Sequence, residues 1–273
     1  MTMPENLCDA HLHYGNPVQL RPLAEHSSLR EQFPCYRTVE FDRMDSYTDR
    51  LAEHHVDRTV LIPFVFRELD KRQENLCVLE KAEEDPERYW PFALLDEDDP
   101  AFLEEHSSRL VGLKEHIVLH KTELTPKRKD ILSSLQAHHM TFLIHTRSDL
   151  RYAYIRDIVH NFPSLKIQVA HMGRARPGDV SFMIEMLEAL APFPHVSFDT
   201  STVRQSQVVE AAVKIVGPER ILYGSDFPFF MDELGIEDIM EQQIRHILKA
   251  GLSSAQQDLI FSENFKRLIT RGI

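Results

Sequence analysis

Short apolar runs alternate with longer amphipathic stretches from one end of the chain to the other. A short apolar run is typical of a buried strand, whereas apolar residues spaced three and four apart indicate a helix. The strands that we expect are Leu7–His13, Arg58–Phe66, Trp90–Asp96, Gly112–Leu119, Thr141–Thr146, Lys166–His171, His195–Asp199 and Arg220–Ser225. The helices that we expect are Ser46–His55, Leu69–Glu84, Thr125–His138, Asp149–Asn161, Val180–Ala191, Gln205–Val216, Ile236–Ala250 and Ser254–Arg271, the last with a capping box of Ser253 and Gln256.

Strands and helices that alternate in this way are typical of βαβ units around a parallel sheet. We interpret the eight expected strands as a closed (β/α)8 TIM barrel, an α/β fold whose usual size of about 250 residues suits this chain of 273. An open, doubly wound sheet is the competing fold. That fold usually has a glycine-rich turn after its first strand, whereas the first strand here ends in His11-Leu12-His13-Tyr14-Gly15.

No linker or internal repeat interrupts the pattern, so residues 1–273 are expected to form a single domain. One long connection, residues 14–45, lacks clear periodicity and contains Pro17, Pro22 and Pro34. It follows the first strand, at the end of a barrel where active sites lie. Because long loops in compact domains often cover a binding site, we expect this segment to act as a lid.

Charge and composition exclude several classes of protein. With 31 basic and 43 acidic residues, the formal net charge of −12 argues against nucleic acid or an anionic membrane as the main partner. No run approaches the roughly 18 apolar residues that span a bilayer, and no secretory signal is visible. The three widely spaced cysteines, Cys8, Cys35 and Cys77, form no disulfide framework, so we expect a protein of the reducing cytoplasm.

Polar residues with metal-binding chemistry stand at the ends of the expected strands. His11 and His13 are two residues apart on the first strand, so both imidazoles point to one face, the barrel interior. Cys8 has the opposite parity and is expected to point away from the interior. Asp199 and Thr200 follow the seventh strand, where they either line the pocket or fix the loop. Further candidates at the strand ends are Lys114, His116, His145, His171 and Asp226.

A single histidine at the end of a buried strand is more often a structural residue than a metal ligand. Five strands that close in such residues at one barrel mouth are hard to explain in that way, because buried polar side chains are costly unless they bind something. Imidazole is the commonest protein ligand for zinc and similar ions. The sequence therefore predicts a divalent metal site at the C-terminal ends of the strands.

An ordered set of motifs spans nearly the whole chain. The segments are Asp9-Ala10-His11-Leu12-His13, Gly112-Leu113-Lys114-Glu115-His116, Leu143-Ile144-His145-Thr146, Val169-Ala170-His171-Met172-Gly173, Ser197-Phe198-Asp199-Thr200-Ser201, Tyr223-Gly224-Ser225-Asp226-Phe227-Pro228 and Glu263-Asn264-Phe265-Lys266-Arg267-Leu268. Together they resemble the amidohydrolase superfamily, specifically the amidohydrolase-related branch of TIM-barrel metal-dependent hydrolases and decarboxylases. Each motif alone is weak, but the ordered set is specific.

The resemblance implies roles for the matching positions. His11, His13 and His145 would be metal ligands, and Asp226 would bind the metal, the attacking water, or both. His171 would bind metal or stand beside the substrate as an acid or electrophile, since family members differ here. The metal would be zinc or, as the second choice, manganese, and would bring the pKa of a bound water down toward about 7. Asp226 could then pass the proton of that water to the leaving group.

Basic residues near the barrel mouth bear on the substrate and on the number of metals. In the wider superfamily a lysine at the position of Lys114 can be carboxylated and bridge two metals, and this lysine lies two residues before His116. The family often has glycine where Arg174 stands here. Because a guanidinium group binds carboxylate or phosphate through two parallel hydrogen bonds, we expect Arg174 to contact an anionic substrate. We expect Lys114 and His116 to contact the same substrate. Further candidates, which could equally be helix-start or surface residues, are Arg67, Arg147 and Arg176.

Three functions remain open from the sequence. The first is hydrolysis of an amide, lactone or ester bond in a small molecule by a metal-activated water. The second is metal-dependent, non-oxidative decarboxylation of an unsaturated or aromatic acid, which the resemblance equally supports. The third is a catalytically silent barrel that acts as a binding subunit. In each case we expect a small-molecule ligand, and a homodimer is compatible with an enzyme of this size.

Overall fold

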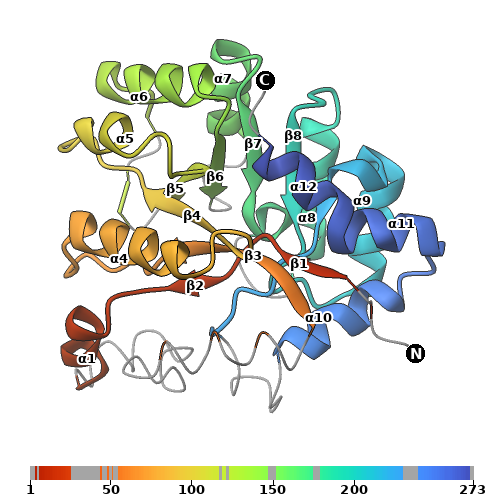
Figure 1. The fold of residues 1–273 in the computed structure, drawn as a ribbon. Coiled ribbons are helices and arrows are strands. Elements are labelled where there is room, and N and C mark those ends of the chain that lie inside the picture. Colours follow the sequence, from red (N-terminus) through yellow and green to blue (C-terminus); the bar gives the residue numbers. More distant parts are fainter. Residues whose placement is uncertain are drawn as a thin grey trace.

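Parallel strands form the interior of the fold, and helices surround them (Figure 1). The computed structural model describes residues 4, 6–25, 44, 48, 51, 55–116, 119–120, 123–146, 152–174, 179–229 and 239–270. The strands are β1 (Leu7–Asp9), β2 (His13–Tyr14), β3 (Val56–Pro63), β4 (Tyr89–Leu94), β5 (Gly112–His116), β6 (Thr141–His145), β7 (Lys166–Val169), β8 (Val196–Asp199) and β9 (Ile221–Leu222). Each pairs in parallel with its neighbours in the order β1-β3-β4-β5-β6-β7-β8-β9, and β2 also pairs with β3.

The segment after β9 returns to the first strand and closes the ring. The amide of Ala10 donates to the carbonyl oxygen of Tyr223 at 2.9 Å, and the amide of His13 donates to that of Phe227 at 2.8 Å. Because β1 and β2 are two halves of one expected strand, eight strand positions form a nearly closed barrel. The prediction of a (β/α)8 TIM barrel is confirmed.

Helices form the outer layer of the fold. They are α1 (Pro17–Glu25), α4 (Lys71–Glu84), α5 (Ala101–Glu105), α6 (Pro126–Ala137), α7 (Ala153–Asn161), α8 (Val180–Leu190), α9 (Ser206–Val216), α10 (Ile239–Leu248), α11 (Ser254–Asp258) and α12 (Asn264–Ile269). A π-helical turn, Leu259–Glu263, joins the last two. The capping box of Ser253 and Gln256 is confirmed. Within the described part of the chain, no helix combines the length and apolar character needed to cross a bilayer.

Two sequence-based expectations differ from the structure near the first strand. The expected strand Leu7–His13 is interrupted, because the carboxylate of Asp9 accepts the amide of His11 at 3.0 Å and draws it out of the ladder. Cys8 packs in one apolar cluster with Phe92 and Leu143, so the prediction that it points away from the interior is wrong. The break resets the alternation of side chains, so that Cys8 and the later histidines all face inward.

The connection expected to lack periodicity contains a helix of its own. The described residues 17–25 form α1, which begins with Pro17 in its first turn and carries Pro22 within it. Most of the remaining segment to residue 45 lies outside the described residues, and so does the expected lid. Most of the expected helix Ser46–His55 and the first residues of the expected helices at Asp149 and Ile236 also fall outside.

The two ends of the barrel differ in chemistry. At the N-terminal ends of the strands, Phe265 and Leu268 of α12 pack in one apolar cluster with Val60 and Phe92. The hydroxyl of Thr141, the first residue of β6, donates to the carbonyl oxygen of Leu268 at 3.1 Å. This end is therefore closed by apolar packing, and the polar residues gather at the opposite, C-terminal ends of the strands.

Candidate metal centre

His11 lies in the interruption between β1 and β2, where its ring points into the barrel. Its Nδ1 lies 2.9 Å from Oδ2 of Asp199, the last residue of β8. Its Nε2 lies 3.4 Å from Oδ1 of Asp226. The carboxylate of Asp9 holds this segment in place, because it accepts the amides of His11 and Ser225 at 3.0 Å each. The local break of the strand is therefore what presents the imidazole to the interior.

His13 and Asp226 complete the first part of the cluster. Nε2 of His13 lies 3.3 Å from Oδ1 of Asp226, while its Nδ1 lies 3.2 Å from the carbonyl oxygen of Pro63 on β3. Asp226 follows β9 and has a positive φ of 61°, a conformation that is uncommon for residues other than glycine. The Nε2 atoms of His11 and His13 thus approach the same carboxylate oxygen from two points of one strand.

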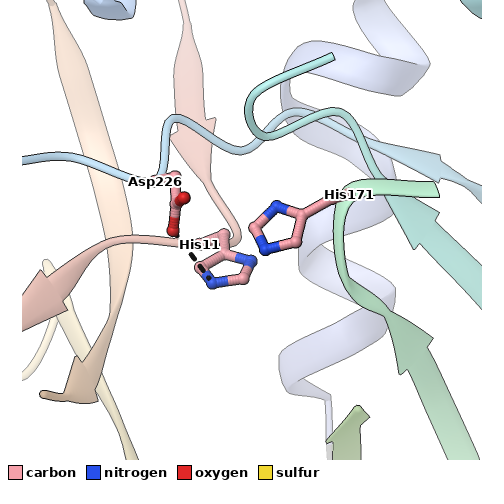
Figure 2. A group of neighbouring side chains, drawn as sticks. All are labelled: His11, His171 and Asp226. Atoms are coloured by element: carbon pink, nitrogen blue, oxygen red, sulfur yellow. Dashed lines mark ion pairs between the residues drawn. The ribbon is translucent and has the colours of Figure 1, made fainter. Parts of the chain in front are cut away.

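His171 reaches the same place from the end of β7. It lies in a 3-10 turn, Ala170–Gly173, with a φ of 55°. Its ring stacks on that of His11 with centroids 4.9 Å apart, and its Nδ1 lies 2.7 Å from the hydroxyl of Ser201. Figure 2 shows His11, His171 and Asp226 converging from three separate segments; they offer ligand atoms that all lie within 4.8 Å of one another.

His145 and His116 form a second layer beside this cluster. Nδ1 of His145 lies 3.2 Å from Nε2 of His171, and the ring centroids of His145 and His116 are 4.2 Å apart. His145 therefore contacts the imidazoles of His171 and His116. Of the residues that the sequence singled out as ligands, the structure brings His11 and His13 to the carboxylate directly and His145 to it only through His171.

The donor set fits a divalent metal ion. In metal sites, the second ring nitrogen of a ligating histidine usually donates to a carboxylate, a carbonyl or a water. Here Nδ1 of His11 contacts a carboxylate, that of His13 a backbone carbonyl and that of His171 a hydroxyl. Burial lowers the pKa of His11, His145 and His171 well below the ordinary value, which favours the neutral ring that metals require.

Two basic side chains are buried beside the imidazoles. Nζ of Lys114 lies 3.3 Å from Nε2 of His11, and desolvation lowers the lysine pKa to about 8. Arg174, directly after the 3-10 turn, is also buried, and its charge contributes to the lowered pKa of His11 and His171. Of the other arginines considered, Arg67 is exposed, whereas residues 147 and 176 lie outside the described residues.

Sequence reasoning did not find the side chains that hold the cluster together. Gln168 on β7 donates to Oδ2 of Asp199 at 2.7 Å and to the carbonyl oxygen of Ala10 at 2.9 Å. Ser201 contacts both His11 and His171. Gln168 stands between two apolar residues of a buried strand, Ile167 and Val169. A polar residue at such a buried position was the sequence signal that could have identified it.

Comparison with solved structures identifies proteins that share this fold. The structure is similar to a putative 2-pyrone-4,6-dicarboxylic acid hydrolase from Pseudomonas putida, with a TM-score of 0.75 and 16% identity over 98% of each chain. It is also similar to a zinc-bound amidohydrolase from Burkholderia multivorans (TM-score 0.72, 15% identity, 97% of this chain and 99% of that one). A third similar structure is 5-carboxyvanillate decarboxylase from Sphingomonas paucimobilis (TM-score 0.70, 16% identity, 98% of this chain and 100% of that one).

Curated protein sequences gave no match to the chain. The family model described as Amidohydrolase matches residues 8–270, which include every residue of the cluster. The match begins within β1 and ends just after α12, so it covers nearly the whole barrel. The chain therefore belongs to the amidohydrolase family.

Proposed function

We propose that this protein is a metal-dependent hydrolase that cleaves an amide, lactone or ester bond in a small anionic molecule. The observation that carries the proposal is the approach of two imidazole Nε2 atoms, from His11 and His13, to one oxygen of Asp226 at 3.4 and 3.3 Å. A divalent cation would bind these three atoms at once and would offset the cost of burying them. Family membership supports an enzyme at this position of the barrel.

Zinc is the first candidate for the metal and manganese the second. Imidazole and carboxylate ligands suit zinc, and a structurally similar amidohydrolase contains it. His11, His13 and Asp226 would hold the ion, and the further ligand would be His171 or His145. When bound, a divalent metal supplies Lewis acidity, which polarises a carbonyl oxygen and makes water more acidic.

Asp226 and His171 are proposed to handle the proton and to contact the substrate. In the proposed hydrolysis, an oxygen of Asp226 accepts the proton from the attacking water and returns it to the leaving group. His171, whose Nδ1 is fixed on Ser201, can act on the substrate through Nε2, as a hydrogen-bond acceptor or, once that nitrogen is protonated, as an acid. Both residues are almost completely buried, and exclusion of water strengthens such interactions.

The substrate is proposed to be anionic because of the charges around the cluster. Lys114 and Arg174 are both buried near His11, and their positive charges at the cluster would attract a carboxylate of the substrate. His116, whose ring packs on that of His145, is proposed to line the same pocket.

Decarboxylation of an unsaturated or aromatic acid is the second candidate. Solved structures with the same fold include 5-carboxyvanillate decarboxylase and 2,6-dihydroxybenzoate decarboxylase from Rhizobium, at 16% and 14% identity, so the fold accommodates this reaction as well. In this reaction the carboxylate leaves as carbon dioxide and a proton takes its place on carbon. His171 or Asp226 would deliver that proton.

The first experiment measures bound metal per chain by mass spectrometry on protein purified without chelators or a histidine tag. The wild type is compared with His11→Ala and with His160→Ala, an exposed histidine of α7, as the matched control. About one equivalent of zinc or manganese that is lost only in His11→Ala supports the proposal. Two equivalents would point to Lys114 as a further, carboxylated ligand.

The metal-loaded protein is then assayed against amides, lactones, esters and aromatic acids that carry a carboxylate. Release of carbon dioxide without uptake of water would establish the decarboxylase instead of the hydrolase. If the protein binds neither zinc nor manganese when they are added, the metal-dependent mechanism fails. The chain would then be a metal-independent lactonase-like relative or a catalytically silent barrel that serves as a binding subunit.

A further inference from the structure

The carboxylate of Asp199 is the most heavily hydrogen-bonded group in the described interior. It ends β8, is completely buried and lies between the two histidines that enter the cluster from β1 and β7. Oδ2 accepts from Nδ1 of His11 at 2.9 Å and from Nε2 of Gln168 at 2.7 Å. Oδ1 accepts from the amides of His171 at 2.9 Å and Ser201 at 3.2 Å, and from the Ser201 hydroxyl.

We propose that Asp199 is a positioning residue that fixes the tautomers of His11 and His171, so that Nε2 of His11 is kept free of a proton for metal. The part that concerns the metal rests on the proposed function. The part that concerns the tautomers depends only on the hydrogen bonds within the chain. Neither part requires Asp199 to touch metal or substrate.

Asp199 determines which ring nitrogen of His11 carries the proton. An ionised carboxylate only accepts hydrogen bonds, so Nδ1 of His11 must carry the proton that it shares with Asp199. In the neutral ring, Nε2 then has a free lone pair. Nζ of Lys114, which only donates, lies 3.3 Å from this Nε2 and agrees with that assignment.

The same control extends to His171 through Ser201. The hydroxyl of Ser201 donates to Asp199, so its oxygen is left to accept from Nδ1 of His171 at 2.7 Å. The backbone carbonyl oxygen of Ser201, which can only accept, lies 3.1 Å from the same nitrogen. His171 is therefore also protonated on Nδ1, and its Nε2 is left to accept from Nδ1 of His145.

Asp199 also holds the backbone of His171. His171 has a φ of 55°, which is unfavourable for a residue with a Cβ atom. Its amide is held by Oδ1 of Asp199, and this bond helps to stabilise the conformation that turns the ring toward His11. One carboxylate thus sets both the protonation pattern and the placement of two imidazoles from different strands.

The decisive variant is Asp199→Asn, which keeps the shape but turns one oxygen into a donor. The amide oxygen is expected to remain on the backbone amides of His171 and Ser201, because two N–H donors would repel the NH2 group. The NH2 group then faces Nδ1 of His11 and the side-chain amide of Gln168, which can rotate to present its oxygen. Nδ1 of His11 must accept, and its proton must move to Nε2. The same substitution in the catalytic triad of serine proteases leaves a histidine in the wrong tautomer.

Nitrogen-15 NMR of the histidine rings in the metal-free protein shows which nitrogen carries the proton. We expect Nδ1 for His11 in the wild type and Nε2 in Asp199→Asn. Zinc affinity, measured by competition with a chromogenic chelator, is expected to fall by about 10- to 100-fold in the variant. The matched control is Asp9→Asn, an equally buried aspartate that contacts the backbone amides of His11 and Ser225 but not the ring of His11. The oxygen of asparagine can still accept both amides, so the tautomer of His11 should be unchanged.

The proposal is overturned if wild-type His11 carries its proton on Nε2, or if Asp199→Asn keeps the Nδ1 proton. It is also overturned if both aspartate variants shift the ring equally, since the effect would then be general damage to the interior. If Asp199→Asn does not fold, the wild-type spectrum alone decides the tautomer. If the wild type binds no zinc, the proposed function fails, yet the ring spectra of the metal-free protein still test the role of Asp199.

Discussion

Nζ of Lys114 lies 3.3 Å from Nε2 of His11, and both side chains are closed off from solvent. The ammonium group therefore uses the lone pair that the proposed metal would need. Two unit charges 4 Å apart interact by about 4 kcal/mol even when the effective dielectric constant is 20. Lys114 and a metal cation therefore compete for one position, unless the lysine is carboxylated.

Lys114→Met tests this competition, because methionine keeps much of the length and removes the charge. We expect zinc affinity in the metal-free protein to rise at least about tenfold, which corresponds to only 1.4 kcal/mol. Titration against a chromogenic chelator measures the change. A fall in the number of bound metals from two to one would give the opposite conclusion, that the lysine is itself a ligand.

Asp226→Asn tests the proton transfer assigned to Asp226. Asparagine tolerates a positive φ better than most residues, so the backbone at 226, with its φ of 61°, should be preserved. The amide cannot accept a proton from water, and we expect kcat to fall by about 10²- to 10⁴-fold. Rates are measured at saturating metal, with bound metal determined in the same sample. A variant that holds metal and keeps its kcat would remove Asp226 from the chemistry.

The sequence predicted the barrel and most of the cluster because both follow from strand periodicity. Parallel strands of a barrel end at one face, so a polar residue that closes an apolar run must lie near the others there. This reasoning found His145, His171 and Asp226 without any contact information. It also found His11 and His13, since residues two apart on a strand share a face.

The contributions of Cys8, Asp199 and α1 could not be read in the same way. The inward position of Cys8 depends on a break in the first strand, where Asp9 accepts the amide of His11 and also that of Ser225, 216 residues further along the chain. The bond between Asp199 and His11 joins residues 188 positions apart. Period and spacing describe neighbours along the chain, so they carry no information on such long-range hydrogen bonds.

A buried network behind β5 gives a prediction about stability. Glu115 points away from the metal cluster and accepts from the hydroxyl of Tyr154 at 2.7 Å, and its Oε1 lies 3.6 Å from the guanidinium of Arg128. Desolvation raises the pKa of Glu115 to about 7 despite this pairing. Arg128→Met leaves Glu115 without its cation and also removes the hydrogen bond that Nε of Arg128 donates to Glu97 at 3.0 Å. We expect a loss of about 3 to 5 kcal/mol in the free energy of unfolding.

The double variant Arg128→Met/Glu115→Gln removes both charges and should recover at least half of that loss. Urea unfolding at pH 7.5 measures all three variants, with Glu115→Gln alone expected to change stability least. Additive losses in the double variant would show that packing by the arginine stem, rather than the charge pair, dominates.

The last prediction concerns Glu74, which lies in the first turn of α4 and holds the segment that follows β2. Its carboxylate accepts the amide of Asn16 at 3.3 Å and the side-chain amide of Gln19 at 2.9 Å, and it is completely buried. Desolvation raises its pKa from 4.5 to about 8. Because the folded protein holds this proton more tightly, the resulting stability is complete below pH 4.5 and is lost as pH rises through about 8.

Glu74→Gln replaces the acid by a neutral group of the same shape and should flatten this part of the pH profile. We expect the variant to exceed the wild type in unfolding free energy at pH 8 by at least about 1 kcal/mol, since one unit of pKa shift is worth about 1.4 kcal/mol. Urea unfolding from pH 5 to 8.5 measures it, with Glu80→Gln on the exposed side of the same helix as control. If the unfolding free energies of Glu74→Gln and wild type change with pH in the same way from pH 5 to 8.5, Glu74 does not lose a proton in this range. Its pKa in the folded protein would then be close to that in the unfolded chain.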